Sequence, residues 1–125
     1  MGQSDKSELV DRRKVLTKAL INAAELTGLK QSTIGKIVGL SAPTMTRMYG
    51  GTYLLKSSGK EWDAARLFIR LYRGLDAITA GDERSLKSWM RSDNLDLRAK
   101  PIDLIKELSG LVHTVDYVDA YRAKV

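Results

Sequence analysis

Apolar residues recur at steps of three and four along most of the chain, which is the spacing of helices that bury one face. From Leu9 to Leu26 the apolar side chains keep to this spacing, while the charged run at residues 11–14 falls mostly on the other side. No segment of useful length alternates in the two-residue period of a strand. The pattern therefore predicts an all-α fold. The predicted helices cover about residues 7–27, 31–38, 42–49, 61–80, 83–91, 101–110 and 111–123.

Residues that favour helix ends occur where the apolar spacing predicts that helices begin or end. Ser58, with Glu61 three residues later, forms a capping-box pattern and predicts that the long helix begins there. Asp82 is placed to cap the next helix. Pro101 suits the first turn of a helix that ends near Gly110. These residues support the helix boundaries expected from the apolar spacing.

The stretch from residue 50 to residue 60 is the most loop-like part of the chain, and we place the boundary between two modules there, at 1–59 and 60–125. The helix after this boundary has an apolar stripe wide enough to serve both a core and a partner. Its aromatic residues fit a core, with an oligomer interface as the alternative. The candidate dimerisation residues are Trp62, Ile69 and Tyr72.

The stretch from residue 31 to residue 51 predicts a helix-turn-helix motif. Gly39 stands at the turn, where a positive φ is easiest for glycine. Gly35 stands where the two helices cross closely and only a small side chain fits. Ser41 is a natural N-cap, and Pro43 lies in the first turn, where its missing N–H costs nothing. The inward-facing residues are Ile34, Val38, Leu40, Met45 and Met48.

The outer side of the second short helix is the candidate DNA-reading surface. In DNA-binding proteins with this motif that surface enters the major groove, where arginine can pair with guanine and a Thr or Ala methyl can touch thymine. Gln31 is placed to meet a phosphate. The alternative is a helical hairpin that binds nothing. The candidate DNA-binding residues are Gln31, Ser41, Ala42, Pro43, Thr44, Thr46 and Arg47.

The distribution of charge favours a polyanionic partner. Residues 1–60 carry ten Lys or Arg against four acids, whereas residues 61–125 carry eleven of each, so the net charge of +6 lies in the first part. Lys and Arg release the counterions condensed on phosphates, so a one-sided excess is typical of nucleic-acid binding. A basic face kept only for solubility is the alternative.

Composition excludes several kinds of site. The chain has no Cys and one His, His113, so it lacks the residues for disulfides, thiolate catalysis and His- or Cys-based metal sites. The segment before Lys60 has Leu54 where a phosphate-binding loop needs its first glycine. No apolar run approaches the roughly 18 residues that span a bilayer. We therefore expect a cytoplasmic protein with no metal, no cofactor and no membrane contact.

The helix-turn-helix resembles that of the Xre or Cro/C1-like repressors. The downstream sequence then resembles the toxin-binding domain of the Xre/MbcA/ParS antitoxins. The resemblance rests on the order of several features: a helix that ends before Gly81-Asp82, the pair Trp89-Met90, Asn94-Leu95, a helix from Pro101, and a glycine followed by valine at Gly110 and Val115. The two resemblances together span most of the chain.

The resemblance implies an antitoxin of a type II toxin–antitoxin pair that is not itself an enzyme. The implied partner is a RES-domain toxin that consumes NAD, and the implied second role is repression of the antitoxin's own operon as a homodimer. The toxin contacts fall at the end of the last helix, where the Val125 carboxylate is expected to mimic a phosphate of NAD. The candidate toxin-binding residues are Tyr117, Tyr121, Arg122, Lys124 and Val125.

Two other functions remain open on the sequence. A plain repressor would use its second half only to dimerise or to sense a ligand. A small enzyme or nucleotide-binding protein is disfavoured by the missing Cys, the single His and the failed phosphate loop.

Overall fold

Most of the described chain is helical, as the apolar spacing predicts. The computed structural model describes residues 2–124, with side chains from Lys6 onward. Within these residues there is no strand, and a single antiparallel bridge joins Asn94 and Ala99. The helices are α1 (Gly2–Thr27), α2 (Gln31–Val38), α3 (Ala42–Tyr49), α4 (Lys60–Ile78), α5 (Glu83–Arg91), α6 (Pro101–Leu104) and α7 (Leu108–Ala123). Among the described residues, no helix is long and apolar enough to cross a bilayer.

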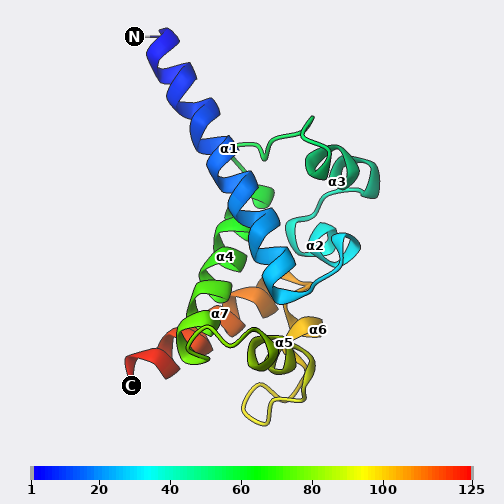
Figure 1. Cartoon of the computed structure of the whole chain (residues 1–125), viewed down its shortest axis with the longest axis vertical. Helices are drawn as coiled ribbons and strands as arrows, with labels where there is room; N and C mark the ends of the chain where they lie inside the picture. The colour runs from blue at the N-terminus through cyan, green and yellow to red at the C-terminus, as the bar shows by residue number, and fades with distance from the viewer. Residues whose placement is uncertain (1, 125) are drawn as a thin grey trace.

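Helix α4 is the centre of the fold, with α1 along one side of it and α7 near its lower end (Figure 1). Phe68, Leu71 and Leu75 of α4 are fully buried, and they belong to the same core as Leu20 of α1 and Leu111 of α7. Helix α2 also packs on α4. The helices on both sides of residue 59 therefore share one core built around α4.

Helix α1 is longer than the sequence predicts, because it begins at Gly2 instead of near Ser7. No proline interrupts its first turns. Its N-terminal half extends beyond the rest of the molecule (Figure 1). At its other end, the Arg91 guanidinium of α5 donates hydrogen bonds to the carbonyls of Thr27 and Gly28, at 3.3 and 2.7 Å, and so ties α5 to the end of α1.

The capping box predicted at the start of α4 is wrong. Gly59 is the residue that precedes the helix, and its φ of 91° is a backbone conformation that glycine adopts most easily. The Glu61 carboxylate is occupied elsewhere: it accepts hydrogen bonds from the Tyr53 hydroxyl at 2.6 Å and from the Lys56 N–H at 2.9 Å. Glu61 thus fixes the loop before α4, and Ser58 plays no capping role.

The helix predicted to run from Pro101 to Gly110 is also wrong. Helix α6 ends at Leu104, and Gly110 lies inside α7, which begins at Leu108. A Cβ atom at Gly110 would collide with the Leu104 carbonyl. Gly110 is required because the backbone of α7 packs directly on the backbone at the end of α6. Gly110 does not end a helix.

Candidate DNA-binding and partner-binding surfaces

The turn between α2 and α3 has the conformation that the sequence predicts. Gly39 has φ 75°, and the N–H groups of Gly39 and Leu40 both donate to the Gly35 carbonyl. A Cβ at Gly35 would lie 3.1 Å from both the Leu40 oxygen and Met45 Cγ. The two helices therefore cross as closely as glycine allows, and this crossing fixes the direction of α3.

Hydrogen bonds organise the outer side of α3. The Ser41 hydroxyl accepts the Thr44 N–H at 3.3 Å, which caps the helix, and donates to Thr44 Oγ1 at 2.9 Å. Thr44 Oγ1 in turn accepts Arg47 Nη2 at 3.0 Å. Gln31 Nε2 donates to Thr46 Oγ1 at 3.3 Å across the motif. Two short chains of hydrogen bonds thus hold these polar side chains in place before any ligand arrives.

The candidate DNA-binding residues lie together in this motif. Thr44 and Gln31 are half-buried and the others are exposed. The arrangement suits contact with base edges by Arg47 and Thr44 and contact with the sugar-phosphate backbone by Gln31.

The candidate toxin-binding residues divide between two sides of α7. Tyr117 and Tyr121 are one helical turn apart, and Tyr121 is half exposed. The Tyr117 hydroxyl donates to Asp96 Oδ2 at 2.7 Å, and this bond, with burial, raises the pKa of Tyr117. Arg122 points instead toward α4, and Lys124 is exposed. Val125 lies outside the described residues.

The connector between α5 and α6 holds one apolar side chain out in solvent. Leu95 is 93% exposed, more than any other large hydrophobic residue described. The loop that carries it is firmly closed: Asn94 Oδ1 accepts the N–H groups of Asp96 and Leu97 at 3.0 Å each, and the Asn94 N–H donates to the Ala99 carbonyl at 3.0 Å. The bond from Tyr117 to Asp96 places this loop beside Tyr117 of α7.

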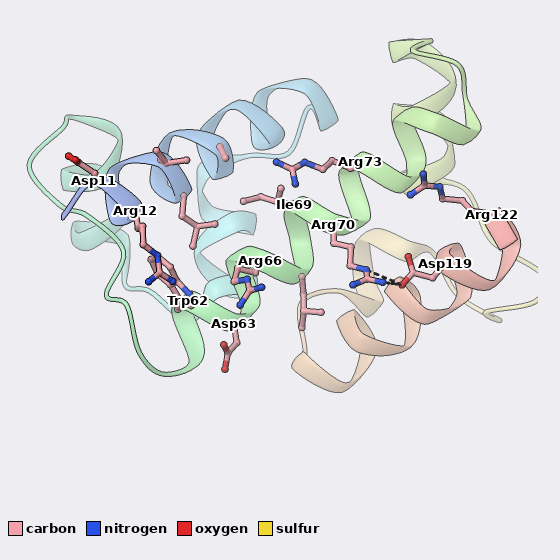
Figure 2. Close-up of a pocket in the computed structure, with 14 residues that line it drawn as sticks. Asp11, Arg12, Trp62, Asp63, Arg66, Ile69, Arg70, Arg73, Asp119 and Arg122 are labelled. Carbon is pink, nitrogen blue, oxygen red and sulfur yellow. Dashed lines mark hydrogen bonds and ion pairs between the residues drawn. The ribbon is translucent and has the colours of Figure 1, made fainter. Parts of the chain in front are cut away.

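A groove with a volume of about 1050 Å³ runs between α1 and α4 and reaches the end of α7 (Figure 2). Arg12 and Trp62 lie at one end of it, and Arg73 and Arg122 lie at the other. Arg70 pairs with Asp119 at 2.8 Å. The apolar side chains that line the groove are Val15, Leu16, Ala19, Trp62, Leu67 and Ile69.

Comparison with known protein families matches both parts of this architecture. The family model described as the Antitoxin Xre-like helix-turn-helix domain matches residues 8–70. The model described as the Antitoxin Xre/MbcA/ParS C-terminal toxin-binding domain matches residues 74–124. The chain belongs to the Xre-like antitoxins. No curated protein matches it. The antitoxin interpretation of the sequence is thereby confirmed, and a repressor whose second half only dimerises is disfavoured.

Two features of this antitoxin were not predicted from its sequence. One is the exposure of Leu95, although Asn94 before it is a residue type that closes turns through its own side chain. The cationic stripe of Arg66, Arg70 and Arg73 on α4 follows a helical spacing that the sequence does contain. Of the candidate dimerisation residues, Trp62 and Ile69 line the groove, whereas Tyr72 lies outside it. Burial raises the pKa of Tyr72, and the nearby Asp76 and Glu83 add to the effect.

Proposed function

We propose that this antitoxin represses its own operon by inserting α3 into the major groove of promoter DNA. The observation that carries the proposal is the exposed, hydrogen-bonded face built by Ser41, Thr44 and Arg47. The basic excess of residues 1–60 supplies the attraction to phosphates. Residues 1–59 act in DNA binding and residues 60–125 act in toxin binding and dimerisation.

The protein binds the promoter as a homodimer. One helix-turn-helix reads only a few base pairs, and a symmetric pair gains affinity by binding two half-sites about one helical turn apart. Footprinting of the DNA upstream of the operon is expected to reveal two protected half-sites related by a two-fold repeat. Protection of one isolated, asymmetric half-site by a monomer would contradict this proposal.

The toxin partner is a RES-domain protein that consumes NAD. Leu95, Tyr117 and Tyr121 form the contact surface, with Arg122 and Lys124 at its edge. The supporting observation is the firmly closed loop that exposes Leu95 and is hydrogen-bonded to Tyr117, one turn before the exposed Tyr121, since exposed apolar and aromatic side chains together are typical of protein interfaces. Both proposed activities are binding activities and require no catalytic residue.

Titration calorimetry with the purified toxin tests the contact surface. Leu95→Ser is expected to weaken binding about tenfold, because an apolar anchor that fits a pocket is worth 1 kcal/mol or more. Leu26→Ser is the matched control, because Leu26 is an exposed leucine at the far end of α1. Equal effects of the two substitutions would remove the Leu95 loop from the interface.

Growth rescue and NAD content test the toxin class and the tail. Induction of the toxin alone is expected to deplete cellular NAD, and co-expression of the antitoxin to restore it. Deletion of residues 121–125 is expected to leave folding and promoter binding nearly unchanged but to impair rescue at matched expression. A toxin that leaves NAD unchanged would reject the RES assignment, and full rescue by the truncated chain would reject the role of the tail.

A further inference from the structure

The loop between α3 and α4 returns to α1, where two side chains bind its backbone (Figure 1). The Arg13 guanidinium donates to two consecutive carbonyls, from Nε to Leu55 at 2.8 Å and from Nη2 to Leu54 at 3.2 Å. The Thr17 hydroxyl, one helical turn further along α1, accepts the Leu55 N–H at 3.0 Å. Thr17 and Leu55 are both buried. These bonds fix the position of residues 54–55 against α1.

The same loop is hydrogen-bonded to the C-terminal end of α3. The Arg47 carbonyl accepts the Thr52 N–H at 2.8 Å and the Thr52 hydroxyl at 3.3 Å. Only Tyr53 separates Thr52 from the segment that α1 binds. The backbone of Arg47, whose side chain is proposed to read a base, is thus connected to α1 through this loop.

Helix α3 depends on such support, because its eight residues are fewer than the roughly 12–15 that an isolated helix needs in water. Its first turn is fixed by the close crossing at Gly35 and by the Ser41 cap. Arg47 lies in its last turn, at the end that the loop supports. A binding group works only if it is held within about 0.5 Å of its productive position. The position of the loop therefore bears directly on base recognition.

A direct contact between Arg13 and a DNA phosphate is the alternative role for this residue. Burial and the hydrogen bond to Glu61 raise the pKa of Tyr53, whereas the charges of Arg13 and Arg47 act in the opposite direction, so both guanidinium groups lie near the Tyr53 hydroxyl. Two observations favour a positioning role. Two nitrogens of Arg13 are bound to carbonyls of the protein, and Thr17, which is buried and uncharged, binds the same segment.

We infer that Arg13 and Thr17 are positioning residues for promoter recognition, which hold the loop after α3 so that Arg47 meets its base pair, while neither residue touches DNA. The inference rests on the proposed binding of DNA by α3. It adds α1 to the parts of the chain that determine promoter affinity, although α1 supplies none of the candidate DNA-binding residues.

Variants that keep or remove the charge of Arg13 separate the two roles in fluorescence anisotropy with the native promoter. Arg13→Met and Arg13→Lys are both expected to weaken binding about fivefold or more, because lysine keeps the charge but lacks the planar pair of donors. Arg12→Met and Arg12→Lys, at the adjacent exposed arginine, are the matched controls. They are expected to change affinity less than about twofold, because salt screens an exposed charge that makes no contact. Wild-type affinity of Arg13→Lys would overturn the inference.

Thr17→Val removes the acceptor of the Leu55 N–H without changing the charge. It is expected to weaken promoter binding to a similar extent, and its combination with Arg13→Lys to cost less than the product of the two effects, since both act through one loop. The slope of log Kd against log salt is expected to stay at the wild-type value in Thr17→Val and Arg13→Met. A slope reduced by about 1 in Arg13→Met would indicate a lost phosphate contact and would overturn the inference.

A variant destabilised elsewhere separates positioning from a general loss of stability. Gly110→Ala perturbs the contact of α7 with α6 and is expected to keep wild-type promoter affinity at a temperature where circular dichroism shows all variants folded. An equal loss of affinity in Gly110→Ala and Thr17→Val would reject the positioning role. Failure of the wild-type chain to bind the promoter would reject the proposed DNA binding, and the inference with it. Unchanged binding by the Arg13 and Thr17 variants, beside a wild-type chain that binds, would reject the inference alone.

Discussion

Replacing Arg47 with alanine removes the side chain best placed to read a base. Arginine paired with guanine O6 and N7 is worth about 1–3 kcal/mol of discrimination. In the free protein Arg47 already donates to Thr44 Oγ1 at 3.0 Å, so contact with guanine exchanges one exposed hydrogen bond, worth about 0.5–1.5 kcal/mol, for two. The expected net loss for Arg47→Ala is therefore about 1–2 kcal/mol, or roughly five- to thirtyfold in affinity.

The hydrogen bond between Thr44 and Arg47 leads to a second prediction, that substitutions at these two residues have non-additive effects. Because Thr44 holds the guanidinium, Thr44→Ala is expected to weaken binding by a similar amount, and the double variant by less than the sum of the two. Lys36→Ala, on the exposed side of α2, is expected to act mildly and equally on all DNA sequences. Arg84→Ala on α5 is the matched arginine control.

Fluorescence anisotropy with the native promoter and a scrambled duplex at one salt concentration measures all five variants, the double variant included. The recognition surface is supported if Arg47→Ala loses affinity for the promoter while binding to the scrambled duplex falls much less. Wild-type affinity of Arg47→Ala for the promoter would refute the assignment of α3 as the reading helix. Strictly additive losses at Thr44 and Arg47 would refute the positioning role of Thr44.

Three further predictions concern salt, packing and pH. Promoter binding is expected to fall steeply with salt in a titration of the dissociation constant, because phosphate contacts release counterions. Gly110→Ala is expected to lower the free energy of unfolding by about 1–3 kcal/mol in urea, since a Cβ there meets the Leu104 carbonyl, whereas Ser109→Ala changes it by less than about 0.5 kcal/mol. Burial, followed by the hydrogen bond to Glu61, raises the pKa of Tyr53 from 10.0 to about 12, so the folded state holds this proton more tightly than the unfolded state. The corresponding stability is complete below pH 10 and is lost as the pH rises toward about 12, and Tyr53→Phe is expected to make the urea midpoint less sensitive to pH over that interval.

The helix-turn-helix was the most predictable part of the chain because its constraints are local. Gly39, Ser41 and Pro43 each impose a conformation on their own residue or on the next turn, and the bounds of α2 and α3 agree with the prediction. The same logic placed α5, whose cap Asp82 accepts the Arg84 N–H. Short-range chemistry of this kind can be inferred from neighbouring residues alone.

The two errors at the start of α4 and at Gly110 have the opposite character, since each involves a residue that contacts a neighbouring segment outside its own helix. Glu61 has the spacing of a capping box, but its carboxylate binds the loop that contains Tyr53 and Lys56. Gly110 has the appearance of a helix stop, but it is required by contact with Leu104 in the preceding helix. Neither contact can be read from helical periodicity, because both depend on how separate segments meet.

The apolar stripe of α4 is wide in the sequence because the helix packs on several neighbours in the structure. A helix that packs on one neighbour needs a narrow apolar face, yet α4 packs on α1, α2 and α7 and still contributes to the floor of an open groove. Phe68, Leu71 and Leu75 are fully buried in the core, whereas Leu67 and the arginines beside it face the groove. The core therefore uses only part of the stripe, and the remainder, bordered by cationic side chains, lines the open groove between α1 and α4.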